Sequence, residues 1–247
     1  MALRYLLPGQ IPVNAIQGFG GMVVSAEGKG MAGRIEREQC RHIIVPMTRK
    51  ITPFTDLKCL FRLIKIFRKE KPDIVHTHTP KAGLLGMLAA KFCGIKVRIH
   101  TVAGLPLMVE KGFKYQLLKF IEKLTYAAAN HVWPNSHSLM QFISKHKLCK
   151  TTRLNIIAKG STNGIAVNRF NKENLDEKII NEIKEQIHYS TGQIYLLCIG
   201  RLVKDKGLIE LVHVFLQLQK ENVNLKLILV GEYENALDPL PEATLLE

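Results

Sequence analysis

Short apolar runs alternate with segments of helical periodicity along most of this chain. The runs rich in strand-favouring residues are at 22–26, 42–46, 73–78, 97–102, 131–136 and 154–160. Between them, apolar residues recur every three or four positions, which predicts helices at 31–40, 56–70, 81–93, 112–129 and 137–146. This alternation predicts an α/β fold class, with a parallel sheet covered by helices on both faces.

A polar, turn-rich stretch at 159–171 interrupts the alternation and is the predicted domain junction. We therefore expect an amino-terminal Rossmann-like domain over 1–165 and a second domain over 166–247. The second domain shows a charged helix, a strand, a helix and a strand, at 173–188, 194–199, 208–220 and 225–230. A full nucleotide-binding half of this architecture needs further β–α pairs, so we expect the second domain to be incomplete within this chain.

The most informative junction joins strand 194–199 to the helix after it. Gly200 ends the strand, and Gly207 opens the helix. The loop between them carries three cations, Arg201, Lys204 and Lys206. Free N–H groups and the positive end of a helix dipole meet these cations at the carboxyl edge of a sheet, which indicates a phosphate site. The alternative reading is a solvated loop that happens to be basic.

The loop also resembles a known family. Residues 200–207, GRLVKDKG, resemble the G-R-L-x-x-x-K-G element of family 4 glycosyltransferases, retaining enzymes of the GT-B fold. The segments 45–57, 71–90, 97–107 and 159–170 are similar to the branch of the family that builds capsular polysaccharide and exopolysaccharide repeat units on a lipid carrier. The resemblance implies a GT-B-like fold of two Rossmann-like parallel-sheet domains. It also implies a donor diphosphate site made of Gly200, Arg201, Lys206 and Gly207.

By the same resemblance, the reaction is transfer of a sugar from a nucleotide-sugar, expected to be a UDP-sugar, to a saccharide carried on polyprenyl diphosphate. No cofactor is expected, because the nucleotide-sugar is a substrate. Family members continue through an E-x7-E pair that contacts the donor, and this pair has no counterpart here. Residues 1–20 resemble a degraded remnant of the strand and glycine loop with which the family opens. A fragment that only binds nucleotide or membrane therefore stays open as the alternative.

Composition narrows the class of protein. At 247 residues, with 47% hydrophobic and 23% charged residues, the chain is globular. No apolar run approaches the roughly 18 to 20 residues of a membrane span, so we expect a cytoplasmic protein, peripheral on the inner face of the cell membrane. The five cysteines are scattered and never form a C-x-x-C pair, which indicates neither a disulfide framework nor a zinc site.

Positive charge is concentrated in the first part of the chain. Residues 1–170 hold 27 Lys and Arg against 8 Asp and Glu, whereas the remaining 77 residues hold 8 against 13. This asymmetry predicts that the first domain faces an anionic membrane surface or another polyanion. Nucleic acid is not expected as a partner, because the sequence has no helix-turn-helix, RNP string, zinc-finger spacing or aromatic platform.

Two basic amphipathic helices carry much of that charge. In helix 56–70, Asp56 is predicted to cap the start, and one apolar stripe consists of Leu57, Leu60, Phe61, Ile64 and Phe67. In helix 111–128 the stripe consists of Phe113, Leu117, Phe120, Ile121 and Leu124, and lysines are interspersed with it. Each stripe either packs on the sheet of its own domain or lies in a bilayer interface, and the sequence leaves both readings open.

A glycine-rich loop at 28–33 is a literal G-x-G-x-x-G between a predicted strand and a predicted helix. A dinucleotide site also needs an acidic residue after the next strand, but Pro46, Met47 and Thr48 stand there. We therefore interpret the loop as a turn near an acceptor phosphate, with a nicotinamide site as the disfavoured alternative.

Histidines gather on two neighbouring predicted strands. His76 and His78 share one side of strand 73–78, and His100 lies on the next, but only Asp73 adds a carboxylate nearby, so no metal site is predicted. His78 is expected at the carboxyl end of its strand with acceptor-side candidates Thr79, Lys81 and Gly83. The family often has a histidine in a T-x-H-G string, where this chain has alanine in Thr101-Val102-Ala103-Gly104. His78 and His100 are the catalytic candidates.

Overall fold

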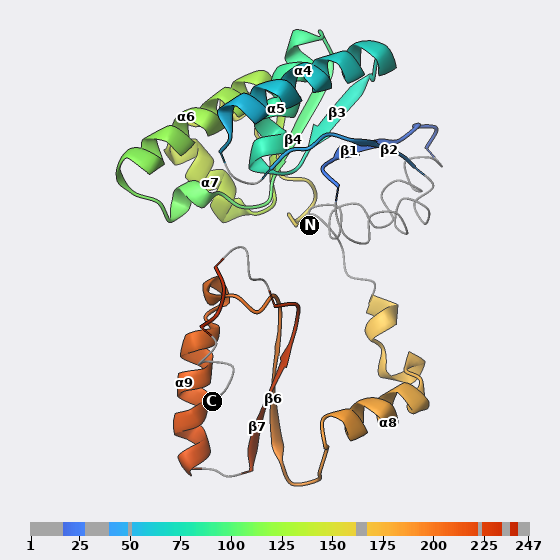
Figure 1. The fold of residues 1–247 in the computed structure, drawn as a ribbon, viewed down its shortest axis with the longest axis vertical. Helices are drawn as coiled ribbons and strands as arrows, with labels where there is room; N and C mark the ends of the chain where they lie inside the picture. The colour runs from blue at the N-terminus through green and yellow to red at the C-terminus, as the bar shows by residue number, and fades with distance from the viewer. Residues whose placement is uncertain are drawn as a thin grey trace. The chain divides into compact units, whose positions relative to one another are not determined.

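The structure, a computed structural model, describes residues 17–27, 40–48, 51–161, 167–221, 224–233 and 238–241. It contains two compact units, Met1–Ile165 and Ala166–Glu247, and each is described by itself (Figure 1). All paired strands of the described residues run parallel, as the α/β prediction requires. The glycine loop 28–33 and nearly all of the predicted helix 31–40 lie outside the described residues.

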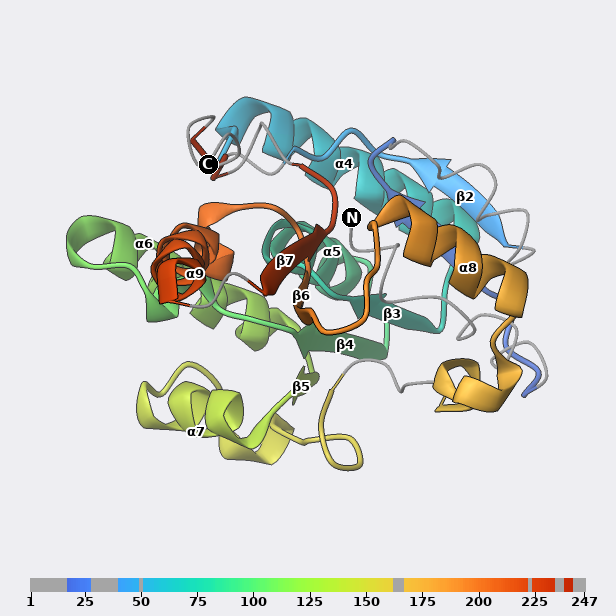
Figure 2. The same cartoon turned by 90° about the horizontal axis from the view of Figure 1, so that it is seen from below.

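The first unit is built on a three-stranded parallel sheet. Its strands are β3 (Ile74–Thr77), β4 (Val97–Val102) and β5 (His131–Pro134), in the order β3-β4-β5, which Figure 2 shows side by side. The register aligns Thr77 with His100 and His100 with Val132. A second parallel pair consists of β1 (Met22–Ser25) and β2 (Arg41–Ile44).

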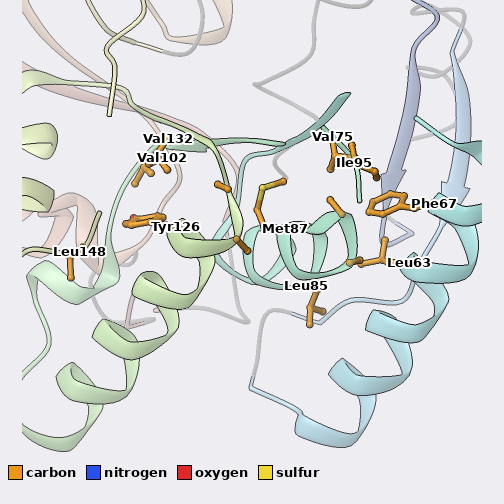
Figure 3. Close-up of a cluster of buried hydrophobic side chains, with 14 of the residues drawn as sticks. Leu63, Phe67, Val75, Leu85, Met87, Ile95, Val102, Tyr126, Val132 and Leu148 are labelled. Atoms are coloured by element: carbon orange, nitrogen blue, oxygen red, sulfur yellow. The ribbon is translucent and has the colours of Figure 1, made fainter. Parts of the chain in front are cut away.

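Three long helices form a layer on this sheet. They are α4 (Pro53–Glu70), α5 (Pro80–Phe92) and α6 (Gly112–Ala128), and the shorter α7 (His137–Lys145) follows β5. Helix α5 packs on β3 and β4, with α4 along one side of it and α6 along the other. The core fills the space between helices and sheet, and Figure 3 shows ten of its labelled members: Leu63, Phe67, Val75, Leu85, Met87, Ile95, Val102, Tyr126, Val132 and Leu148.

Helix α4 begins earlier than the sequence predicts. Its N-cap is Thr52 and Pro53 is its first residue, a position where the missing N–H of proline costs nothing. Asp56 is therefore not the cap but lies one turn inside the helix. Its carboxylate accepts hydrogen bonds from the Thr52 N–H at 3.1 Å and from the Thr52 hydroxyl at 3.0 Å. Asp56 still satisfies a donor at the helix start, but from within the helix rather than from its end.

Both predicted apolar stripes are turned partly away from the core. In α4 the buried positions are Cys59, Leu63, Ile64 and Phe67, whereas Leu57 and Phe61 are exposed. In α6 the exposed residues include Phe113, Phe120 and Leu124. The reading in which each whole stripe packs on its own sheet is therefore wrong for both helices.

The predicted strand 154–160 is also wrong. Only Leu154 bridges to β5, at Val132, and the Asn155 N–H donates to the Val132 carbonyl at 3.1 Å. Ala158 and Gly160 have φ angles of 50° and 93°. A left-handed backbone cannot continue an extended strand, so the chain turns away from the sheet after one bridge.

The second unit contains the parallel pair β6 (Ile194–Ile199) and β7 (Leu225–Val230), with helices α8 (Glu177–Gln186) and α9 (Leu208–Glu221). The Asp176 side chain caps α8 by accepting from the Lys178 N–H at 2.8 Å. Helix α9 buries Leu208 and Val212. In neither unit does a described helix have the length and apolar character needed to cross a membrane.

Candidate functional site

The loop between β6 and α9 is held in place by backbone hydrogen bonds to the segment after β7. Its N–H donors and their acceptors are Gly200 to the Val230 carbonyl (2.9 Å), Leu202 to the Glu232 carbonyl (3.0 Å) and Lys204 to the Asp238 carbonyl (3.2 Å). The Asp205 N–H donates to the Asp238 carboxylate at 2.7 Å. The loop thus continues the sheet beyond its last regular pair.

Two glycines shape the start of α9. Gly207 has φ 68° and ψ 25°, a left-handed conformation that glycine adopts without steric cost. Its carbonyl accepts the Leu211 N–H at 2.9 Å, so the N–H groups of residues 208–210 have no acceptor within the helix. Gly231 lies under the loop, because a Cβ there would be 1.6 Å from the Gly200 carbonyl oxygen. The result is a tight turn that opens onto a helix N-terminus.

The loop turns its apolar side chain inward and its cations outward. Val203 is fully buried, whereas Lys204 and Lys206 are exposed. Arg201 lies 3.6 Å from the Asp205 carboxylate, a long, solvent-exposed ion pair of the kind that contributes little to stability. A guanidinium at this position beside a helix N-terminus can form charge-assisted hydrogen bonds with a diphosphate. This arrangement brings together the four residues predicted to bind the donor diphosphate.

In the first unit, the predicted acceptor-side residues follow β3. Thr79 is the N-cap of α5, but its side chain makes no capping hydrogen bond. Lys81 lies in the first turn of α5, and its ammonium group donates to the Asp56 carboxylate at 2.7 Å and to the Thr48 and Thr52 hydroxyls at 3.2 and 3.3 Å. Burial alone would raise the pKa of Asp56, but the hydrogen bonds from Lys81 and Thr52 outweigh it and lower that pKa.

The rings of His76 and His78 lie side by side, with centroids 4.1 Å apart, whereas His100 lies on the opposite face of the sheet from His76. His100 is 2% exposed on the sheet face under α5, and its Nδ1 shares a 2.8 Å hydrogen bond with the Thr77 hydroxyl. Gly83 gives it room, because a Cβ there would lie 2.4 Å from the His100 Cε1. His76 lies on the other face and shares a 2.8 Å hydrogen bond with the Thr101 hydroxyl. Within the described residues, no three His, Cys, Asp or Glu side chains are grouped so that they could hold a metal ion.

His78 differs from the other two histidines in having an unused polar atom. Its Nδ1 is buried and finds no hydrogen-bond partner among the described residues. Burial lowers its pKa to about 4, so the imidazole is neutral near pH 7. A neutral imidazole can donate a hydrogen bond to a hydroxyl or accept one from it, which suits the role predicted for this position.

The sequence did not reveal the residues that hold the loop after β6 and the lysine after β3 in place. Asp238 and Gly231 hold the loop after β6, and Asp56 holds Lys81. No local pattern marks them, because each acts on a residue more than twenty positions away.

Comparison with known proteins places the chain in a family. Residues 17–160 match the glycosyl transferase 4-like domain, and residues 179–247 match glycosyl transferases group 1. A capsular polysaccharide biosynthesis glycosyltransferase of Staphylococcus aureus is 36% identical over 94% of this chain and 60% of its own length. A UDP-Gal:alpha-D-GlcNAc-diphosphoundecaprenol alpha-1,3-galactosyltransferase of Escherichia coli is 30% identical over 58% of this chain and 38% of its own length.

Solved structures agree on the fold. A glycosyltransferase from Rickettsia africae superposes with a TM-score of 0.67 at 20% identity, covering 90% of this chain and 55% of the other. An Anabaena protein in complex with UDP and glucose superposes with a TM-score of 0.64 at 13% identity, covering 90% of this chain and 57% of the other. The predicted GT-B-like α/β fold is thereby confirmed, and the chain spans about 60% of the length of the S. aureus relative. Because the match to the first of the two domains covers more than half of the sequence, the protein belongs to the glycosyl transferase 4-like family.

Proposed function

We propose that this protein acts as a glycosyltransferase in surface polysaccharide synthesis, transferring a sugar from a UDP-sugar to a polyprenyl-diphosphate-linked saccharide with retention of configuration. The observation that carries the proposal is the loop 200–207, which presents Arg201 and Lys206 beside a helix N-terminus. Two relatives support the choice of substrates: the S. aureus protein is a capsular polysaccharide glycosyltransferase, and the E. coli protein acts with UDP-Gal on a diphosphoundecaprenol-linked acceptor.

The proposed chemistry is stabilisation of the leaving group. As the bond between the sugar and the donor breaks, its electron pair passes to the diphosphate oxygen, where negative charge grows. Arg201 and Lys206 offset this charge, aided by the N–H groups of residues 208–210. The oxygen of the acceptor hydroxyl forms the new bond to the sugar carbon, and its proton passes to the departing diphosphate. We infer no need for a cofactor or metal ion, so transfer should be unchanged by EDTA.

The acceptor side of the proposal lies at the end of β3. His78 has a neutral ring and an unused nitrogen, which suit contact with a hydroxyl of the acceptor saccharide. Thr79 has a side chain that is not used for capping and can bind the same acceptor. Lys81 is a positioning residue here, since its ammonium group ties α5 to α4 through Asp56. The acceptor's lipid places the reaction at the inner face of the cell membrane.

The test compares Arg201→Ala with Lys178→Ala, an exposed lysine on α8 of the same unit. We expect Arg201→Ala to lower the transfer rate about 100-fold or more and to weaken UDP binding measured by calorimetry, while Lys178→Ala changes neither. Unchanged rate and affinity in Arg201→Ala would refute the assignment of this loop. UDP binding without any transfer by the wild-type chain would favour the alternative of a binding module.

A further inference from the structure

The loop that follows β6 carries a carboxylate among its cations. Asp205 stands between Lys204 and Lys206, and its carboxylate lies 3.6 Å from the Arg201 guanidinium. A loop that only had to bind anions would gain from a neutral side chain here, because a carboxylate close to the arginine repels every phosphate that approaches. The charge of Asp205 therefore opposes the binding of anions at this loop.

The fold holds the backbone of this ion pair in place. Val203, between the two residues, is fully buried and bridges to Pro239. The Asp205 N–H donates to the Asp238 carboxylate at 2.7 Å. Arg201 and Asp205 thus extend from a stretch of chain that is anchored between them and at Asp205 itself, so the carboxylate is kept close to the guanidinium.

Both members of the pair are open to solvent, and therefore to a ligand. The side chain of Asp205 is 54% exposed and that of Arg201 is 30% exposed. Two further carboxylates lie near the loop. Asp238 accepts the Asp205 N–H, and the Oε2 of Glu210, in the first turn of α9, lies 3.9 Å from the position that a Cβ on Gly207 would take. Asp205 is the carboxylate that approaches the guanidinium to which the proposed function assigns the diphosphate.

The donor and the product of the proposed reaction differ in charge. In a nucleotide-sugar, each phosphate of the diphosphate has one ionised oxygen, because the terminal phosphate is esterified to the sugar. After transfer, the terminal phosphate of UDP has a second ionisable oxygen, which loses its proton above a pKa of about 6, as in other phosphate monoesters. At pH 8, a nearby carboxylate therefore repels UDP more strongly than it repels the donor.

We propose that the Asp205 carboxylate lowers the affinity of this loop for the UDP product more than for the nucleotide-sugar donor, and so favours release of UDP after each transfer. The inference rests on the proposed function for the identity of the diphosphate, and it adds a residue that sets the discrimination between product and donor. Asp205 acts through its charge on the ligand and on Arg201, without contact with the reacting atoms. Salt weakens such an effect, because the pair is exposed.

The test compares two ligands in wild type and Asp205→Asn by calorimetry at pH 8. The ligands are UDP and the methyl ester of its terminal phosphate, which keeps the charge of a nucleotide-sugar without carrying a sugar. The substitution leaves the backbone hydrogen bond from residue 205 to Asp238 in place. We expect Asp205→Asn to bind UDP about fivefold more tightly and the methyl ester about twofold more tightly, and high salt to shrink both changes.

Two variants and a second pH serve as controls. Glu182→Gln removes an exposed carboxylate from α8, the helix that precedes the amino end of β6, and should change neither affinity. Asp205→Glu keeps the charge and should keep the ratio of the two affinities close to that of wild type. At pH 5 the terminal phosphate of UDP holds a proton, so Asp205→Asn should strengthen the binding of UDP only as much as that of the methyl ester.

The outcomes separate this inference from the proposed function. Equal changes for UDP and the methyl ester at pH 8 would overturn the inference and leave the proposed function intact. Weaker binding of both ligands by Asp205→Asn would also overturn it, because the ion pair would then serve to hold the loop in shape. In a transfer assay, UDP should inhibit Asp205→Asn at an about fivefold lower concentration than wild type, and unchanged inhibition would contradict the inference. If wild type binds neither ligand, the inference and the proposed donor site fall together.

Discussion

The two units each place a lysine shortly after a parallel strand, and the two lysines differ in what surrounds them. Lys81, after β3, is largely buried against the Asp56 carboxylate at 2.7 Å. Lys206, after β6, is exposed, and no ion pair joins it to a described residue. The first cation is neutralised by its own fold, whereas the second is available to an anion from solution.

This difference teaches that a short, largely buried ion pair makes the cation at a strand's carboxyl end part of the fold, whereas an exposed cation without such a pair is available to a ligand. In the β3–α5 junction, the counterion comes from a different helix, 25 residues away in sequence. In the β6–α9 junction, the carboxylate of Asp238 could have served, but it accepts the Asp205 N–H instead. Substitutions should therefore affect stability at the first junction and ligand binding at the second.

The largest expected effect is on catalysis, from Lys206→Ala. Removing this ammonium should lower the transfer rate about 100-fold, because the charge on the departing diphosphate loses a partner, while the free energy of unfolding stays within about 0.5 kcal/mol of wild type. Calorimetry should show a greater loss of affinity for UDP than for uridine. Equal losses for both ligands would mean that Lys206 contacts something other than the diphosphate.

The next effect is on stability, from Gly83→Ala at the β3–α5 junction. The new methyl group would lie 2.4 Å from the His100 ring, so helix and sheet must separate, and we expect a loss of about 2 kcal/mol in the free energy of unfolding. Urea titration measures it. Gly104→Ala is the control, since nothing lies within 4 Å of its added Cβ. If both variants lose the same stability, the tight contact at Gly83 is not what limits the packing.

The strands, helices and loops of both junctions could largely be predicted from local sequence. The contacts that could not be predicted join residues far apart in the chain. Strand β6, its loop and helix α9 were predictable because an apolar run, two glycines and a helical period stand next to one another. The outward cations follow from the same string. The anchoring of that string by Asp238 and Gly231 joins residues more than thirty apart, and no periodicity encodes it.

Errors arose where a local pattern had two physical meanings. The stripe of α6 has helical spacing whether it faces the sheet or the outside, so the sequence left both readings open, and the burial of Glu122 and Tyr126 on the opposite side shows that the stripe faces outward. Likewise, 154–160 is apolar enough for a strand, but the left-handed backbone at Ala158 and Gly160 prevents one. Asp56 sits early in its helix in either reading, and Pro53 moves the start back by a turn.

A third effect depends on pH and belongs to the β3–α5 junction alone. Burial lowers the pKa of His100 to about 4, below its unfolded value near 6.5, so between these values the unfolded chain binds a proton that the folded chain does not. Stability should fall as the pH drops from 6.5, by up to about 1.4 kcal/mol per pH unit for this histidine.

Urea titrations at pH 7, 6 and 5 measure the slope. His100→Gln should reduce the slope of the free energy of unfolding against pH by the contribution of about one proton, even if the variant is less stable at every pH. His131→Gln, at an exposed position, should leave the slope unchanged. A slope identical in His100→Gln would show that other groups account for the acid sensitivity. UDP binding to the loop 200–207 should follow a different pH profile, since His100 is not part of that loop.

The smallest expected effect comes from Asp56→Asn, and it tests the comparison most directly. The amide keeps the shape of the carboxylate but removes its charge, so Lys81 loses its counterion and the Thr52 N–H keeps a partner. We expect a loss of about 1 kcal/mol in the free energy of unfolding, larger than for an exposed pair because both side chains are mostly buried. Lys81→Met should cost a similar amount, and the two changes together should cost less than their sum, because they remove one interaction. UDP affinity should be unchanged in all three variants. If Asp56→Asn instead gains affinity for inorganic phosphate, Lys81 without its counterion binds anions as Lys206 is proposed to do. The counterion alone then accounts for the difference between the two junctions. If stability does not change, the 2.7 Å pair contributes nothing and the contrast between the two lysines must have another cause.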